Sequence, residues 1–486
     1  MTASPADPPT PPSATLFRDY WWWLFCLSIV CLKFALFGID PHPQMFMGDS
    51  GSYLWTAVSG WIPPDRSFLY GFIIRWVSFP TQSLDSLLVL QVFLGAATAI
   101  SLAYICRLVL QFSSRVSYSA GLICAVDPLQ LVWERYLMTE TISLALYALM
   151  LLGSLSYLRR RNPWQLLLVQ ILAVLTISFR ISYLPTVEAT AVALPVIAFM
   201  PFLRSGLAAA SRWSTLRTLS AHLALSIVAM LALHLGYKQI NGYLAGRPPA
   251  YLYSSGLSIL STWAPVLHAA DSPDPRLARI ISQGAQFHLG EARLRNSQLY
   301  SKGYLIDRWK ETEFDSARAD GIAKQTALHA LLHRPTRIFA LGFATFLGYF
   351  NPVQIHKQAV SDLGNGEWPK PSAEKLAGRL HLVSPPPQAA GLHTVLQRYF
   401  LVAQPYYYVV ALCPLFCAAF LFFLRETHLL LIFLHASIFL GTNSLLAVTA
   451  SVRYLQPVSF LTVLLFALIA HHLSHSSVQA RPSIAS

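Results

Sequence analysis

Apolar stretches of roughly 20 residues recur along almost the whole sequence, the first at residues 20–39 and the last at residues 454–470. A helix of about 20 apolar residues crosses the roughly 30 Å hydrocarbon core of a bilayer. Helices also satisfy every backbone hydrogen bond internally, which lipid requires. The sequence therefore predicts an all-α polytopic membrane protein and excludes a soluble globular domain.

The composition supports a membrane protein and argues against nucleic-acid binding. Only 12% of the 486 residues are charged and 55% are hydrophobic, with a mean hydropathy of +0.48, whereas soluble chains carry about 25% charged residues. The net charge of +13 comes from Lys and Arg residues in short clusters between the apolar stretches. Membrane topology explains such clusters, so we expect no nucleic-acid partner.

We expect a bundle of about 10–11 transmembrane helices. The positive-inside rule places Arg-rich turns, such as residues 159–161, in the cytoplasm. The loops at residues 40–83, at 127–135 and around residue 180 then share the outer face. The predicted spans are residues 20–39, 84–110, a stretch from 117 interrupted at 127–128, 136–158, two within 164–203, 219–240, a short span or re-entrant helix at 337–350, 399–424, 428–448 and 454–470.

The same pattern divides the chain into five parts. A Pro/Ala/Ser/Thr-rich disordered tail is expected first, and the polar segment before residue 335 is expected to form a small extracytoplasmic helical subdomain. The predicted parts are the tail at 1–18, an N-terminal transmembrane module at 19–240 with a catalytic first outer loop at 40–83, the subdomain at 241–334, a C-terminal transmembrane region at 335–470 and a C-terminal tail at 471–486.

The first outer loop contains the sharpest local feature, an acid among small residues in the segment Gly48–Leu54, followed by Arg66. Asp49 could accept a proton from an incoming hydroxyl or amine, and Arg66 could bind a phosphate. Alternatively, Asp49 caps a helix that begins at Ser52, and Arg66 only reaches the interface with its charged end.

Glu140 lies within the start of a predicted span, after the Met-Thr of Met138 and Thr139. An unpaired carboxylate is costly there, so Glu140 should meet a partner or a metal ion in a protein-lined cavity. The alternative is a structural ion pair in which Glu140 or Glu134 binds Arg135 or Arg180.

Arg180 and Arg453-Tyr454 lie at predicted outer turns, where cations suit lipid phosphates. Each could be an ordinary interfacial anchor. Because they share one face with Asp49 and Glu140, the pattern favours a phosphate site.

These motifs resemble those of the GT-C membrane glycosyltransferases, most closely the protein mannosyltransferase and lipid A aminoarabinose transferase branch. The resemblance covers about the first 240 residues, and Arg453-Tyr454-Leu455-Gln456-Pro457 is similar to a late Arg-Tyr-x-x-Pro element of such chains. The sequence lacks their paired acidic motif in the first loop and their C-terminal sugar-binding domain.

The resemblance implies a set of roles. Asp49 and Glu140 are the expected catalytic residues and also the candidate ligands of a divalent cation, Mg or Mn. We assign the donor phosphate to Arg66, Tyr70, Arg180, Arg453 and Tyr454, and we assign support of the site or contact with the acceptor to Ser50, Tyr53 and Glu134.

The expected function is an inverting glycosyltransferase that moves a sugar from a polyprenyl-phosphate donor to a glycolipid, polysaccharide or protein acceptor. The expected location is the bacterial cell inner membrane, with the active site facing the periplasm. The alternative from another class is a polytopic transporter or flippase of a lipid-linked sugar, which would place its charges near the bilayer midplane and show repeated halves.

Overall fold

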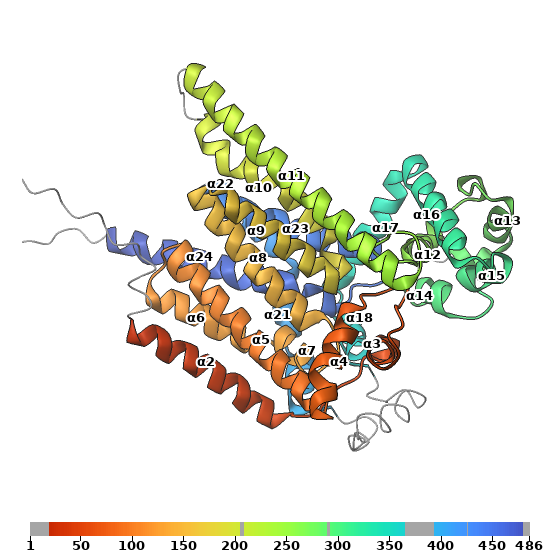
Figure 1. Ribbon diagram of the computed structural model, residues 1–486, viewed down its shortest axis with the longest axis horizontal. Coiled ribbons are helices and arrows are strands. Elements are labelled where there is room, and N and C mark those ends of the chain that lie inside the picture. Colours follow the sequence, from red (N-terminus) through yellow and green to blue (C-terminus); the bar gives the residue numbers. More distant parts are fainter. Residues whose placement is uncertain (1–18, 205–208, 289–291, 365–392, 425, 480–486) are drawn as a thin grey trace, which may run out of the picture.

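The computed structural model describes residues 19–204, 209–288, 292–364, 393–424 and 426–479. The predicted N-terminal tail at 1–18 lies outside the described residues, as does the end of the C-terminal tail. Within them the chain is helical, and its β-structure is one isolated parallel bridge between Gln44 and Tyr136. The helices form an elongated bundle with a smaller helical unit at one end (Figure 1).

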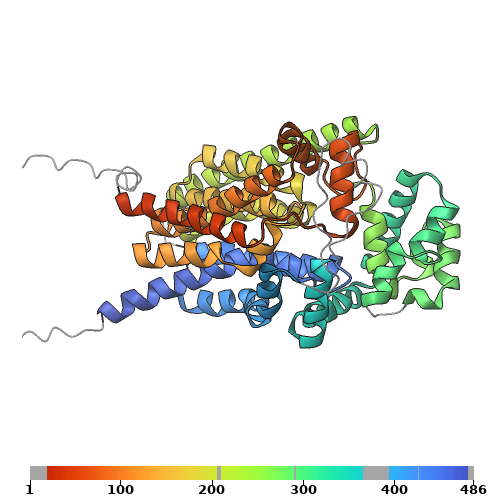
Figure 2. The same ribbon diagram turned by 90° about the horizontal axis from the view of Figure 1, so that it is seen from below.

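Seven helical stretches among the described residues are long and apolar enough to cross a membrane. They contain α2, α5, α8, α10, α11, α23 and α24. In Figure 2 the start of α2 and the end of α24 lie at one end of the bundle, and the smaller helical unit lies at the other. The stretches are Tyr20–Ile39, Asp85–Val109, Glu140–Arg160, Ile181–Leu203, Ser211–Ala245, Thr427–Leu446 and Val452–Ser474.

Every predicted apolar stretch is helical, but four of them are not single straight spans. Helix α6 has 12 residues, Ser114–Ala125, and α9 has 17 residues, Pro163–Phe179. Two further stretches are bent pairs: Pro335–Phe350 with Pro352–Leu363 at 88°, and Gln404–Ala411 with Cys413–Leu424 at 48°. By length and composition, the described residues therefore contain seven helices that could cross a membrane, or up to nine if each bent pair is one span, compared with the 10–11 expected from the sequence.

A buried ion pair ties the first membrane helix to the loop before α8. The Lys33 ammonium of α2 lies 2.5 Å from Glu134 Oε1, and both side chains are almost fully buried. Arg135 lies beside Glu134 and donates to the backbone oxygen of Asp40. Gly95 of α5 faces this pair, and a Cβ there would lie 1.9 Å from Glu134 Oε1. The loop that leads into α8 is thus fixed from inside the bundle.

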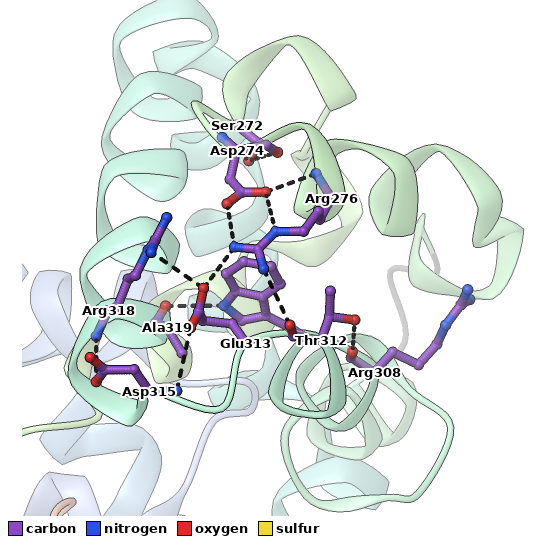
Figure 3. Close-up of polar contacts among 10 residues, drawn as sticks. Ser272, Asp274, Arg276, Arg308, Thr312, Glu313, Asp315, Arg318 and Ala319 are labelled. Carbon is purple, nitrogen blue, oxygen red and sulfur yellow. Dashed lines mark hydrogen bonds and ion pairs between the residues drawn. The ribbon is translucent and has the colours of Figure 1, made fainter.

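The smaller helical unit has a hydrophobic core of its own, which runs from Leu257 to Ile338. A network of ion pairs links its helices (Figure 3): Arg276 binds both Asp274 and Glu313, and Arg318 also binds Glu313. Its helices are α12 (Ser255–Thr262), α13 (Pro275–Gln283), α14 (Ala292–Tyr300), α15 (Leu305–Thr312) and α16 (Ser316–His333).

The remaining helices connect and close the bundle. Helices α3 and α4 lie in the predicted first outer loop, between α2 and α5. Helix α24 continues to Gln479, so residues 471–479 belong to this helix rather than to a separate tail. The bounds are α2 (Tyr20–Ile39), α3 (Met47–Ser59), α4 (Leu69–Thr81), α5 (Asp85–Tyr104), α7 (Pro128–Trp133), α8 (Glu140–Arg160), α10 (Leu184–Arg204), α11 (Ala209–Ala245), α17 (Pro335–Leu347), α18 (Pro352–Leu363), α20 (Val395–Val402), α21 (Gln404–Ala411), α22 (Cys413–Leu424), α23 (Thr427–Leu446) and α24 (Gln456–Gln479).

Candidate active site

A cavity of about 240 Å³ lies where the bundle meets the smaller helical unit. It is lined from at least six separate parts of the chain. The lining residues are Asp49, Tyr53, Asp65, Arg66, Ser67, Met138, Thr139, Glu140, Ile177, Phe179, Arg180, Ile181, Ser182, Tyr237, Tyr251, Leu252, Ser258, Tyr300, Arg453 and Tyr454.

Backbone contacts bring the first loop beside the start of α8. Gln44 N–H donates to Arg135 O at 2.7 Å, and Leu137 N–H donates to Gln44 O at 3.0 Å. The Ser50 hydroxyl accepts from Phe46 N–H and donates to Leu137 O. These bonds hold the first turn of α3 against the segment that precedes Glu140, although the two lie about 90 positions apart in the sequence.

Asp49 lies in the first turn of α3, which begins at Met47, so it does not cap a helix starting at Ser52. An acid in a first turn interacts favourably with the positive end of the helix dipole. Its carboxylate lies 2.6 Å from Arg66 Nη1 and 3.3 Å from Arg453 Nη1. The side chain is 26% exposed, so a molecule in the cavity can reach it.

Glu140 is the first residue of α8 and its side chain is only 1% exposed. Its Oε1 lies 3.2 Å from Arg180 Nη1 and 3.1 Å from Arg453 Nε. The structural ion pair of Glu140 with Arg180, weighed from the sequence, is therefore present. Arg453 binds both carboxylates, so it links Asp49 to Glu140.

Arg66 is held by a second acid that sequence reasoning did not assign to the site. Its Nε donates to Asp65 Oδ1 at 3.0 Å, and Nη2 also binds the Asp65 carboxylate. Burial lowers the pKa of Arg66, but the hydrogen bond that Arg66 donates to Asp65 and the charge of Asp49 outweigh it, so the net shift is upward. Arg66 is thus a fixed cation at the mouth of the cavity.

The loop that carries Arg453 is clamped by Asp362 of α18. Asp362 Oδ2 accepts from the Ser451 hydroxyl at 2.8 Å and from Arg453 N–H at 3.1 Å. Gln358 Nε2 donates to the other oxygen of Asp362. The guanidinium of Arg453 also lies over the ring of Phe46, 4.6 Å from its centroid. Arg453 therefore projects into the cavity from a defined backbone position.

Part of this polar lining has no hydrogen-bond partner among the described residues. Both terminal nitrogens of Arg180 and the Oε2 atom of Glu140 are buried without one. Arg180 ends α9, and its guanidinium lies 5.6 Å from the ring centroid of Tyr454. Buried polar groups are nearly always hydrogen-bonded, so groups without a partner beside a cavity point to a ligand.

Tyrosines form much of the remaining wall. Burial raises the pKa of Tyr53, and the nearby charge of Asp49 raises it further. Tyr300 comes from α14 in the smaller helical unit, and its side chain is largely exposed. Both phenols are neutral near pH 7 and can donate hydrogen bonds to a polar ligand.

The arrangement does not fit a divalent cation held by Asp49 and Glu140. Each carboxylate is bound by two guanidinium groups, and both share Arg453. The described segments of the chain contain no group of three or more His, Cys, Asp or Glu side chains that could hold a metal ion. Mg²⁺ prefers carboxylate and other oxygen ligands, which here are neutralised by arginine.

The structure brings seven of the ten sequence-predicted residues to this cavity: Asp49, Tyr53, Arg66, Glu140, Arg180, Arg453 and Tyr454. Tyr70 does not line it, because its hydroxyl is buried against Gln91. Ser50 is used in the backbone contacts of α3, and Glu134 is paired with Lys33 inside the bundle. Ser50 therefore supports the first turn of α3, whereas the side chains of Tyr70 and Glu134 are bound inside the bundle.

Residues missed from the sequence include Asp65, Tyr237, Tyr251 and Tyr300, all of which line the cavity. Asp65 is next to Arg66 in the first outer loop, so its charge and position could have indicated that it belongs to the site. The three tyrosines come from α11, the loop after it and α14, where no local motif marks them.

No family model matches the chain, and no curated protein matches it. Among solved structures, the chain is similar to the apo crystal structure of the oligosaccharyltransferase of Archaeoglobus fulgidus, with a TM-score of 0.45 and 13% identity. The match covers 96% of this chain and 53% of that one, so this chain spans about half the length of the archaeal protein. The functional assignment below rests on the residues of the cavity.

Proposed function

We propose that this protein is a membrane glycosyltransferase that moves a sugar from a polyprenyl-phosphate donor to an acceptor at the outer membrane face. The observation that supports this most is a single cavity in which three carboxylates and three arginines converge from distant parts of the chain. The acceptor is a hydroxyl or amine of a glycolipid, a polysaccharide or a protein.

The donor phosphate would bind the arginines. The Nη2 group of Arg180 is buried without a hydrogen-bond partner among the described residues, so a phosphate oxygen can accept from it while Nη1 stays beside Glu140. Arg453 and Arg66 also line the cavity, where they would stabilise negative charge as it develops on the leaving phosphate. The leaving group departs as a stabilised anion, so no general acid is needed.

Asp49 is the better candidate for the general base. Its carboxylate is 26% exposed, whereas that of Glu140 is 1% exposed and is bound by Arg180 and Arg453. The acceptor oxygen or nitrogen attacks the anomeric carbon while the bond from that carbon to the phosphate oxygen breaks. The acceptor proton passes to Asp49, and the electron pair of the broken bond stays on the polyprenyl phosphate. A single displacement of this kind inverts the anomeric carbon.

Glu140 then has a positioning role, because it holds Arg180 and Arg453 in place from the start of α8. The tyrosines offer stacking surfaces and hydrogen-bond donors to a sugar. Tyr300 contributes to the wall from α14, so the smaller helical unit is placed to face the acceptor. The membrane helices would hold the prenyl tail. No step in this scheme uses a metal ion.

We place the cavity on the periplasmic side of a bacterial cell inner membrane. Arginines gather at the opposite end of the bundle, at the end of α8 and near the start of α11, and cytoplasmic loops are enriched in such residues. These arginines are Arg159, Arg160, Arg161, Arg212 and Arg217.

The test is release of polyprenyl phosphate from a radiolabelled polyprenyl-phosphate sugar by the purified chain in liposomes. We expect release by the wild type and loss of about 10²-fold or more in Asp49→Asn, since a positioned base contributes about that much. Asp85→Asn is the matched control, because Asp85 is an exposed acid at the start of α5 that does not line the cavity.

The same assay separates the transferase from a flippase. Movement of intact donor across the bilayer, with the sugar-phosphate bond uncleaved by wild type, would favour the transporter. A folded Asp49→Asn variant with wild-type turnover would remove Asp49 as the base.

A further inference from the structure

A second cavity, of about 510 Å³, lies at the opposite end of the bundle from the candidate active site. Helix α8 joins the two, because Glu140 at its start lines the first cavity and Arg159 near its end lines the second. Its 21 residues correspond to about 31 Å at a rise of about 1.5 Å per residue. The second cavity is lined by Val109, Leu110, Gln111, Phe112, Leu158, Arg159, Arg161, Glu426, Thr427, His428, His471 and His472.

Two arginines supply cationic charge that no carboxylate neutralises. Arg159 Nη1 donates to the carbonyl oxygens of Leu108 and Val109, at 3.1 and 3.0 Å. Arg161 Nε donates to Ala198 O at 3.1 Å, and its guanidinium lies 4.1 Å from the ring centroid of Phe202. Neither arginine forms an ion pair with any carboxylate in the described segments. Both are therefore anchored by neutral contacts and keep their charge available.

The carboxylate that lines this cavity is already occupied. Glu426 lies 3.2 Å from His472 Nε2 and 3.7 Å from His428 Nδ1. The His428 imidazole beside Glu426 holds the pKa of that carboxyl below its usual range. Glu426 therefore stays ionised, and the two arginines outnumber its single negative charge. An anion entering the cavity would meet an excess of positive charge.

Two residues of the cavity wall hold backbone conformations that are unusual for side chains with a Cβ. Gln111 has φ = 60° and Arg161 has φ = 52°. Residues held in the left-handed region gather at ligand-binding positions more often than elsewhere. Here the left-handed turn after α8 sets the direction in which the Arg161 side chain leaves the helix.

The wall of the second cavity contains both apolar and charged side chains, which favours a membrane lipid over a free ion as the ligand. Val109, Leu110, Phe112 and Leu158 line one part of it, and the cationic and histidine side chains line the rest. A ligand with an anionic head and an apolar body fits such a wall. The cavity also lies at the end of three membrane-length stretches, which contain α8, α23 and α24, where lipid head groups are found.

We propose that this cavity binds the phosphate group of an anionic phospholipid, with Arg159 and Arg161 as the phosphate ligands. The apolar part of the wall contacts the glycerol and the first carbons of an acyl chain. The site lies on the other membrane face from the candidate active site, and its occupancy does not depend on glycosyl transfer.

Binding is measured on the purified full chain in detergent, by native mass spectrometry and by thermal shift. The probes are short-chain phosphatidylglycerol, short-chain phosphatidylcholine and inorganic phosphate. We expect phosphatidylglycerol to bind and raise Tm, phosphatidylcholine to bind at least about tenfold more weakly, and the shift to shrink between about 50 mM and about 500 mM salt because charge carries the contact.

The variants are Arg159→Gln, Arg161→Gln and their Lys counterparts. The Gln variants are expected to lose at least about tenfold in apparent affinity for phosphatidylglycerol, and the Lys variants to keep most of it. Arg160→Gln is the matched control, because it removes the same charge from the neighbouring position of α8 but does not line the cavity.

Three results would overturn the proposal. One is equal binding of phosphatidylglycerol and phosphatidylcholine by the wild type. Another is equal loss of binding in Arg160→Gln and in the two cavity variants, which would indicate general surface charge. The third is a Tm response to inorganic phosphate alone, which would make the cavity an ion site rather than a lipid site.

Discussion

Arg453 forms ion pairs with both Asp49 and Glu140, so its replacement tests the arrangement of the candidate active site most sharply. Its Nε lies 3.1 Å from Glu140 and its Nη1 lies 3.3 Å from Asp49. At an effective dielectric constant of about 20, one such pair interacts by about 4 kcal/mol before desolvation is subtracted. Removing one partner of a buried pair costs about 3–5 kcal/mol, because the other charge is left uncompensated. Glu140 is 1% exposed and would keep Arg180 as its remaining partner, so we expect a cost at the lower end of this range.

For Arg453→Gln we therefore expect a loss of folding stability of about 3 kcal/mol. We also expect kcat to fall by about 10²-fold or more, since removal of one group that stabilises the leaving charge has an effect of about that size. Arg453→Lys keeps the charge, but one ammonium cannot contact both carboxylates as the guanidinium does. It should fall between the wild type and the Gln variant.

The assay is sugar transfer from a polyprenyl-phosphate donor, measured as kcat and KM, with Tm measured on the same samples. Arg337→Gln is the control, because Arg337 is an exposed arginine of α17 that does not line the cavity. A folded Arg453→Gln variant with wild-type kcat would refute the reasoning. So would a Lys variant that is as impaired as the Gln variant, because charge would then have no part in the effect.

Three further predictions concern the surroundings of the site, and one concerns the smaller helical unit's surface. Asp362→Asn, which loosens the loop that carries Arg453, should lower kcat by about tenfold while Tm changes little. A large loss of Tm that accounts for the loss of activity would contradict a positioning role. Glu134→Gln leaves the buried Lys33 ammonium without its anion and should destabilise the protein by about 3–5 kcal/mol without changing KM, as measured by thermal unfolding beside kinetics. Addition of EDTA should leave transfer unchanged, because the site's carboxylates are bound by arginines; loss of activity that Mg²⁺ restores would contradict this. The pKa of Asp274 is lowered by the hydrogen bond from Arg276, so the ionised carboxylate stabilises the fold above the ordinary pKa of Asp, and this stabilisation is lost as the pH falls through the lowered pKa. Amide exchange in the smaller helical unit, corrected for intrinsic rates, should therefore rise at acidic pH in the wild type and should depend less on pH in Arg276→Gln.

The membrane helices and the face shared by the site residues could be predicted from the sequence. Apolar length gave the helices, and the positive-inside rule placed the loops of Asp49, Glu140, Arg180 and Arg453 together, as the cavity has them. The number of uninterrupted spans could not be predicted as well. Bends at residues 351 and 412 and the short helices α6 and α9 depend on packing, which apolar length does not report.

Two of the assigned residues, Tyr70 and Glu134, do not line the cavity, and each case has a local explanation. Tyr70, Ile74 and Ser78 repeat every four residues on α4 and share its buried face, a helical pattern that indicates packing rather than a ligand contact. Glu134 was treated as part of the site because its partner was overlooked. Lys33, a lone charge inside the first apolar span, signals a buried acid elsewhere in the bundle.

The residues that sequence reasoning missed are ones that tertiary structure alone assembles. Asp362 clamps the loop of Arg453 from about 90 positions away, and Tyr300 reaches the cavity from a different folding unit. Nothing in the local sequence of either marks it as part of a polar cavity.

The central claim is that the carboxylates and arginines of one outer cavity bind a lipid phosphate and its sugar. The most direct measurement is a cryo-EM structure of the chain with a non-cleavable polyprenyl-phosphonate sugar. The account predicts the phosphonate oxygens within hydrogen-bond distance of Arg180 and Arg453, and the anomeric carbon facing the side of the cavity that holds Asp49. A ligand seated elsewhere, for example between helices near the bilayer midplane with this cavity empty, would contradict it.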